Sequence, residues 1–114
     1  MSATATVRDS DGVAIVDLAG RFTLGDGSNL LRSTVKEMVD AGRKKILLNL
    51  ADVSYIDSSG LAEMASAFVT VSNMGGQLKL LNPQTRLKDL LQVTRLYTLF
   101  VTFTDESEAV KSFS

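Results

Sequence analysis

The chain has 114 residues and a formal net charge of −1, and 45 % of its residues are hydrophobic. This length suits one core, so we expect residues 1–114 to form a single domain. Because the charges are nearly balanced and no basic cluster stands out, nucleic acid is not an expected partner. The absence of histidine and cysteine excludes thiol nucleophiles, imidazole bases, Ser-His-Asp triads and structural zinc sites within one chain.

The sequence shows no sign of a membrane span, a signal peptide or a cofactor. Its apolar runs are only a few residues long, which is too short to cross a bilayer. Residues Met1–Thr6 lack the charged and apolar parts of a signal peptide, and without cysteine nothing indicates an oxidising compartment. We therefore expect a cytoplasmic protein that needs no metal or cofactor. No paired carboxylates mark a catalytic cleft, so we expect no enzymatic activity.

The N-terminal residues predict a β-hairpin. Residues Thr4–Arg8 alternate loosely, as in an edge strand, and Asp9–Gly12 has the composition of a tight turn. The run Val13–Leu18 is rich in β-branched residues and predicts the second strand.

A glycine-rich connection, Gly20–Gly27, leads to the first predicted helix. Either Asp26 or Ser28 is expected to cap that helix. Its buried face is predicted from apolar residues at helical spacing, namely Leu31, Val35, Met38 and Val39. Residues Gly25–Leu30 imitate the start of a dinucleotide-binding fingerprint, but leucine replaces the third glycine, so a flexible connection is the better interpretation.

The central part of the chain predicts a buried strand followed by a long helix. The run Ile46–Leu50 is apolar at four of five positions, which is typical of a strand covered on both faces. Residues Ala51–Ile56 lead from it into a turn. The helix is expected over Ser59–Asn73, and the glycine pair Gly75-Gly76 ends it.

The last third predicts two more strands and two helices. A short strand at Gln77–Leu81 is followed by Asn82-Pro83, which has the form of an N-cap and first residue of a short helix. We expect a final strand at Leu99–Phe103 and a terminal helix that opens at Thr104–Glu108. The order β-β-α-β-α-β-α-β-α predicts an α/β fold, a mixed sheet with an N-terminal hairpin and helices packed against it.

The turn Asp57-Ser58-Ser59-Gly60 places two hydroxyls at the start of the long helix, where backbone N–H groups favour negative charge. In a purely structural interpretation, Asp57 or Ser58 caps the helix and Gly60 allows tight packing against the sheet. Without histidine neither serine has its usual activating base, so nucleophilic catalysis is disfavoured. The alternative functional hypothesis is that another protein modifies the turn. Ser58 is then the expected acceptor, and Ser59 is the second possible acceptor.

The stretch Val53–Leu61, with Asp-Ser-Ser-Gly-Leu at its end, closely resembles the signature of the STAS domain family. That family is named for sulphate transporters and anti-sigma factor antagonists. The resemblance covers nearly the whole chain, because the hairpin, the strand Ile46–Leu50, the pair Gly75-Gly76 and the pair Asn82-Pro83 all follow the family order. It implies a STAS-like mixed sheet. The free-standing length fits the antagonists better than the transporters.

The resemblance also implies a function for the turn. In the antagonists, the serine that follows the aspartate is phosphorylated by a partner that is both a serine kinase and an anti-sigma factor, and that serine corresponds to Ser58. The unphosphorylated antagonist would bind this kinase, and the kinase would then release a sigma factor. Phosphorylation of Ser58 would block this binding, and a serine phosphatase would restore it. We expect the partner-binding residues to be Asp57, Ser58, Ser59, Gly60, Asp26 and Gly27, in a monomer or weak homodimer.

An alternative within the same family is a scaffold or adaptor subunit of a larger complex, as in stressosomes or lipid-transport assemblies, with little or no switching at Ser58. Native mass separates the two interpretations. A large homogeneous complex would favour the scaffold, whereas a monomer or dimer would favour the switch.

Overall fold

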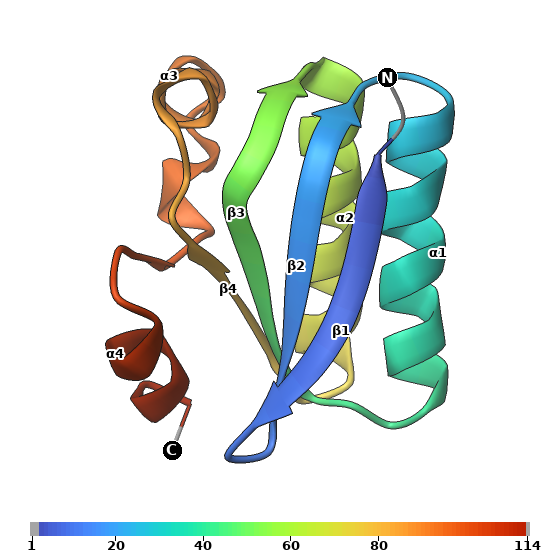
Figure 1. Ribbon diagram of the computed structural model, residues 1–114, viewed down its shortest axis with the longest axis vertical. Coiled ribbons are helices and arrows are strands. Elements are labelled where there is room, and N and C mark those ends of the chain that lie inside the picture. Colours follow the sequence, from blue (N-terminus) through green and yellow to red (C-terminus); the bar gives the residue numbers. More distant parts are fainter. Residues whose placement is uncertain (1–2, 114) are drawn as a thin grey trace.

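Five strands form one sheet in the order β1-β2-β3-β4-β5 in the computed structural model, which describes residues 3–113 (Figure 1). The strands are β1 (Thr4–Ser10), β2 (Val13–Phe22), β3 (Lys45–Ile56), β4 (Gln77–Leu81) and β5 (Thr102–Phe103). The helices are α1 (Asp26–Asp40), α2 (Ser58–Asn73), α3 (Thr85–Thr94), the short 3₁₀ helix η1 (Leu96–Thr98) and α4 (Glu106–Lys111). The predicted mixed sheet and element order are confirmed, with η1 as an addition.

Strand β1 runs antiparallel to β2, and the remaining neighbours are parallel. Ile15 of β2 lies opposite Leu47 of β3, which in turn lies opposite Lys79 of β4. Because parallel strands point the same way, β2 and β3 end at the same edge of the sheet, where α1 and α2 begin (Figure 1). Ligand and partner sites in open α/β sheets commonly lie at this edge.

Apolar side chains fill the space on both faces of the sheet. The larger cluster joins alternate residues of β2 and β3 to α1, α2 and α3, with members that include Val16, Leu48, Leu31, Met64 and Leu87. The smaller cluster lies on the opposite face, under α4, and contains Val13, Ile15, Leu47, Leu81, Ala109, Val110 and Phe113. Coverage on both faces explains why β2 and the first half of β3 are nearly continuous apolar runs, as predicted for Ile46–Leu50.

Two strands extend further than the sequence suggested. Strand β2 continues past Leu18 to Phe22, and β3 continues past Leu50 to Ile56. The pairing between them shifts register in the segment 17–21. Such irregularities break the alternation of apolar and polar residues, so the periodicity gave no sign that the strands continue.

The predicted cap of α1 is wrong. Gly25 occupies the N-cap position with a φ of 101°, and no side chain caps the helix. Asp26 is the first helical residue, and the buried Ser28 lies inside the helix, where its hydroxyl donates to the carbonyl of Thr23 (3.0 Å). Glycine fits this place because the backbone is left-handed there.

The C-terminal third also departs from expectation. Asn82 is not an N-cap: it has a φ of 55° at the end of β4, and α3 begins at Thr85 after Gln84. Asparagine tolerates left-handed backbone, which explains the residue type without a capping role. The final strand is only Thr102–Phe103 rather than Leu99–Phe103. The terminal helix begins at Glu106, later than Thr104.

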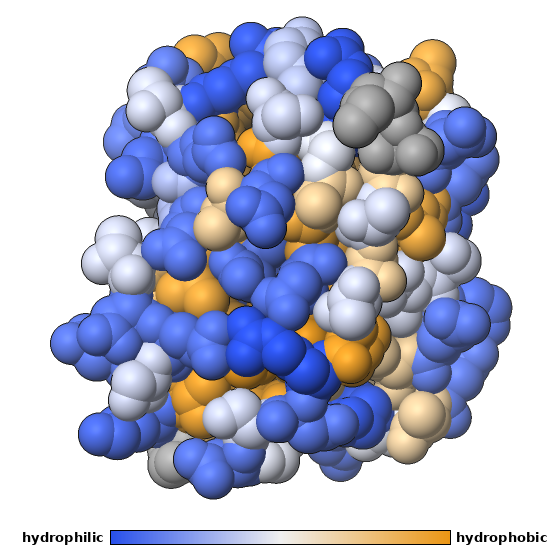
Figure 2. All heavy atoms as spheres, in the orientation of Figure 1, coloured by the Kyte–Doolittle hydropathy of each residue, from blue (hydrophilic) through white to orange (hydrophobic). Residues whose placement is uncertain are grey.

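A polar network lies on the face of the sheet opposite α1 and α2, where hydrophilic side chains cover much of the surface (Figure 2). Arg8 of β1 donates to Asp17 of β2 (Nε–Oδ2 2.6 Å) and to Glu106 of α4 (Nη2–Oε1 2.6 Å). Asn49 of β3 also donates to Asp17 (2.8 Å). Hydrogen bonds from Arg8 lower the pKa of both carboxyl groups, and through them the network ties the hairpin to α4.

Glu106→Gln is expected to lower the free energy of unfolding by less than about 1 kcal/mol, because Arg8 and Glu106 are both partly exposed. The loss should shrink at high salt, since ions screen exposed pairs. Urea unfolding at low and high salt measures both effects. Glu108→Gln is the matched control, because Glu108 is exposed on the same helix. A loss that is independent of salt would contradict the assignment of an ion pair.

Candidate functional site

Asp57 caps helix α2. Its backbone is extended, and its side-chain Oδ1 accepts hydrogen bonds from the N–H groups of Ser59 (2.9 Å) and Gly60 (3.0 Å). The structure therefore assigns the cap to Asp57 rather than Ser58. These backbone donors, Gly60 first, lower the pKa of the Asp57 carboxyl, so the carboxylate is anionic at neutral pH.

The other oxygen of Asp57 fixes the loop between β2 and α1. Oδ2 accepts a hydrogen bond from the N–H of Leu24 (3.1 Å). The same loop is held internally, because the N–H and hydroxyl of Ser28 both donate to the carbonyl of Thr23 (3.0 Å each). One carboxylate thus links the start of α2 to the loop that precedes α1. The structure brings together the two separate stretches that the sequence singled out, Asp26-Gly27 and Asp57–Gly60.

Gly27 and Gly60 are packing residues in this arrangement, and both are buried. A Cβ atom on Gly27 would lie 2.5 Å from the carbonyl oxygen of Arg21 and 2.6 Å from Cα of Phe22. A Cβ atom on Gly60 would overlap the carbonyl oxygen of Phe22 and lie 2.7 Å from Cγ1 of Ile56. Both helices therefore begin directly against the end of β2, and neither glycine offers a side chain to a partner.

The outer surface of this edge is formed by Leu24, Asp26 and Ser58, which we call the Ser58 surface. Ser58 is exposed as the first residue of α2, and its hydroxyl forms no hydrogen bond within residues 3–113. Asp26 is exposed, and Ser59 is half-buried. Leu24 is 81 % exposed, although its backbone N–H is bound by Asp57. Sequence reasoning missed Leu24, although a lone leucine among glycines was a visible signal.

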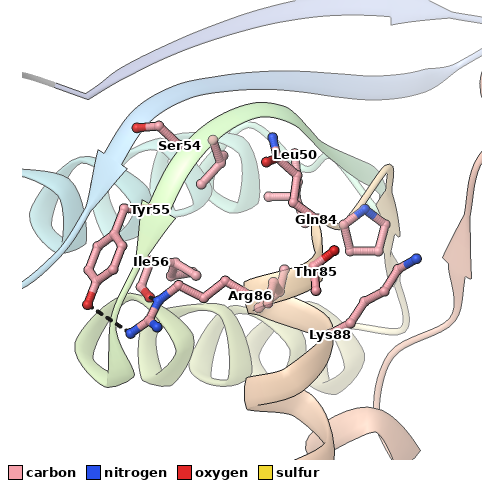
Figure 3. A pocket seen from close by; sticks show the side chains of 11 residues that line it. Leu50, Ser54, Tyr55, Ile56, Gln84, Thr85, Arg86 and Lys88 are labelled. Atoms are coloured by element: carbon pink, nitrogen blue, oxygen red, sulfur yellow. Dashed lines mark hydrogen bonds between the residues drawn. The ribbon is translucent and has the colours of Figure 1, made fainter.

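A second group of side chains lies on the other side of β3. The guanidinium of Arg86 donates to the backbone carbonyl of Ile56 (3.0 Å) and to the hydroxyl of Tyr55 (2.8 Å). It also lies over the Tyr55 ring, 4.2 Å from the centroid, while Arg21 lies 4.6 Å from the same centroid. Figure 3 shows Arg86 reaching from α3 to the end of β3, with its bond to Tyr55 dashed.

Arg86 can contact the end of β3 because β4 is short. Strand β4 pairs with only Lys45–Asn49, so the second half of β3 has no strand on that side. Two side chains donate to carbonyl groups there instead: Gln84, just before α3, to that of Ala51 (2.5 Å), and Arg86 of α3 to that of Ile56. Between β3 and the start of α3 lies an open cavity of about 350 Å³ (Figure 3). No local sequence pattern indicates this cavity, since its walls come from distant segments.

Within residues 3–113, the structure shows neither a cluster suited to a metal ion nor a helix suited to crossing a membrane. No cluster of three or more acidic side chains lies there in a position to hold a metal ion. None of the helices in residues 3–113 combines the length and apolar character that crossing a bilayer requires.

Comparison with known families identifies the relatives of this chain. The STAS domain family matches residues 4–109. The chain belongs to this family. The STAS domain described here is 31 % identical to the anti-sigma-B factor antagonist of Bacillus subtilis over 96 residues, which is 84 % of this chain and 86 % of the relative. Relatives from Thermotoga neapolitana and Thermotoga maritima align over 66 % of their own length.

Solved structures show the same fold. A Thermotoga maritima protein, named as a candidate anti-sigma factor antagonist, superimposes on this STAS domain with a TM-score of 0.88 at 25 % identity, covering 96 % of this chain and 93 % of that one. The Bacillus protein SpoIIAA, solved in its phosphorylated form, superimposes with a TM-score of 0.76 at 18 % identity, covering 97 % and 100 %. The predicted STAS-like fold is confirmed. By homology, this STAS domain has its relatives among the anti-sigma factor antagonists.

Proposed function

We propose that this protein is an anti-sigma factor antagonist controlled by phosphorylation of Ser58. Unphosphorylated, the Ser58 surface binds an anti-sigma factor that is also a serine kinase, and this binding releases a sigma factor. The kinase transfers the terminal phosphoryl group of ATP to Oγ of Ser58, with loss of the hydroxyl proton and release of ADP. A serine phosphatase reverses the modification. In this scheme the protein is the substrate and performs no catalysis itself.

The observation that carries the proposal is the position of Ser58. Its hydroxyl is exposed and forms no hydrogen bond to the rest of residues 3–113, so a kinase can reach it without unfolding the helix. The adjacent Asp57 holds the neighbouring loop in place, which presents Leu24 and Asp26 beside the acceptor. A rigid surface of this kind binds a partner with little loss of conformational entropy.

Phosphorylation is expected to change the interface and leave the fold intact. A phosphoserine carries a charge of about −1.5 to −2 at neutral pH. At Ser58 this charge stands beside the Asp57 carboxylate and near the exposed Asp26, so a surface that was weakly acidic becomes strongly acidic. Binding to an acidic partner surface is then opposed by like-charge repulsion, which can cost several kcal/mol.

The test is binding of the purified cognate kinase to variants of the full chain. Ser58→Asp should weaken binding at least about tenfold, which corresponds to about 1.4 kcal/mol, while its thermal midpoint stays close to that of the wild type. Ser58→Ala should bind and should accept no phosphate from ATP. The matched control is Ser107→Asp, which adds the same charge at another exposed serine and should bind normally.

Two results would contradict the proposal. Phosphate on Ser59 in the wild-type protein, with Ser58 unmodified, would reject the acceptor assignment. A large fall in the thermal midpoint of Ser58→Asp would show that the residue has a structural role, because the loss of binding would then follow from unfolding.

A further inference from the structure

A phosphate on Ser58 would find the N–H groups of the next two helix residues already occupied. The N–H groups of Ser59 and Gly60 both donate to Oδ1 of Asp57, and the N–H of Leu24 donates to Oδ2. A helix N-terminus ordinarily attracts phosphate through free N–H groups. Here the Asp57 carboxylate binds the N–H groups of Ser59 and Gly60, so the phosphate meets a like charge beside them.

Two elements bring charged side chains to the backbone next to Ser58. They are the Asp57 carboxylate at the start of α2 and the Arg86 guanidinium on α3, which binds the Ile56 carbonyl. The carboxylate lies toward the β2–α1 loop, as the bond from Leu24 to Asp57 shows. On the α3 side of β3, the Arg86 guanidinium is bound to the backbone two residues before Ser58.

Arg86 is anchored close to Ser58 by its bond to the Ile56 carbonyl (3.0 Å). Only Asp57 separates Ile56 from Ser58, so the two Cα atoms are no more than about 7.6 Å apart. Arg86 is exposed, and two of its three guanidinium nitrogens are engaged, Nε by Ile56 and Nη2 by Tyr55. Nη1 forms no hydrogen bond within residues 3–113. The guanidinium can therefore turn its two Nη groups toward a phosphate while Nε stays bound to Ile56.

We infer that Arg86 pairs with the phosphate of phosphorylated Ser58 and gives up its hydrogen bond to the Tyr55 hydroxyl. This inference rests on the proposed modification of Ser58. Arginine binds phosphate through paired N–H groups, and such charge-assisted bonds are stronger than a neutral bond to a phenol. Phosphorylation then does more than add charge: it removes Arg86 from the surface as a free cation and releases the Tyr55 hydroxyl. Both changes are available for a partner to recognise.

The experiment installs phosphoserine at position 58 of the full chain during translation, so that it depends on no kinase. The phosphate is titrated by ³¹P NMR. The midpoint depends on the Asp57 carboxylate, which disfavours the dianion, and on any neighbouring cation, which favours it. Arg86→Gln, which keeps a donor for the Ile56 carbonyl, should raise the midpoint by about 0.5 to 1 pH unit. Lys111→Gln removes one positive charge from α4 and should leave the midpoint unchanged.

A second readout needs no variant. In the phosphorylated wild-type protein, the Arg86 Nε–H resonance should shift with pH and share the midpoint of the ³¹P titration. A midpoint that is the same in Arg86→Gln as in the wild type, or an Arg86 resonance that does not follow the phosphate, would overturn the inference. So would a midpoint that moves in Arg21→Gln but not in Arg86→Gln. Each of these results leaves the kinase proposal standing, because that proposal is tested by binding and by phosphate transfer to Ser58.

Discussion

Gly60→Ala is expected to lower the free energy of unfolding by about 3 kcal/mol or more. Alanine is usually preferred over glycine within a helix by about 1 kcal/mol, so propensity alone predicts the opposite sign. The steric effect dominates because a Cβ atom at this position overlaps the Phe22 carbonyl oxygen and lies 2.7 Å from Cγ1 of Ile56. The Phe22 carbonyl belongs to the backbone of a strand between two others, which cannot move aside as a flexible side chain can.

Urea unfolding of the wild type and Gly60→Ala measures this effect. Ser59→Ala is the matched control, since it changes the preceding residue of the same helix and should alter stability by less than about 0.5 kcal/mol. If Gly60→Ala were as stable as the wild type, α2 would not begin in contact with the end of β2.

Asp57→Ala is expected to cost about 2 kcal/mol, from the loss of an N-cap and of the bond that fixes the loop. The three N–H groups of Ser59, Gly60 and Leu24 lose their acceptor in this variant. Asp57→Asn keeps one carbonyl oxygen and the shape of the side chain, so it should recover part of the loss. Because Ser58 follows directly, loss of the loop bond should also reduce kinase binding.

The contribution of Asp57 should depend on pH with a defined sign. Its pKa is lowered in the folded protein, so the folded state favours the anionic form. The stabilisation is present above the ordinary pKa of about 3.9 and is lost as the pH falls through the lower folded value. The difference in stability between the wild type and Asp57→Ala should therefore be constant near neutral pH and shrink below about pH 4. A difference that grows on acidification would contradict the cap assignment.

The helices and the centre of the sheet followed from the sequence, because apolar spacing is a local property. The stripe through Leu31, Val35 and Met38 does face the core, as predicted, and so does the run Ile46–Leu50. The spacing of apolar residues did not predict the second halves of β2 and β3, because register shifts there break the alternation of apolar and polar residues. It also failed at Asn82, where a residue typical of a cap instead permits a left-handed backbone.

The candidate site was predictable only in part. The turn at Asp57 was visible because its residues are adjacent and of the types that begin helices. Its link to Leu24 spans 33 positions, and the contact of Arg86 with Ile56 spans 30, so no local pattern could reveal them. The sequence singled out Gly27 as a candidate site residue. Only the packed structure shows why glycine is needed there, because a Cβ atom would meet the backbone of Arg21 and Phe22.

The shortness of β4 has a mechanical consequence for the end of β3. In the first half of β3, backbone hydrogen bonds join the strand to β2 on one side and to β4 on the other, and these bonds act together against displacement of the strand. The second half has such pairs on one side only, and on the other it is held by the side chains of Gln84 and Arg86. Side-chain ties break one at a time. The strand that leads to Ser58 is thus held by backbone pairs on both sides in its first half, and at its tip by backbone pairs on one side and two side chains on the other.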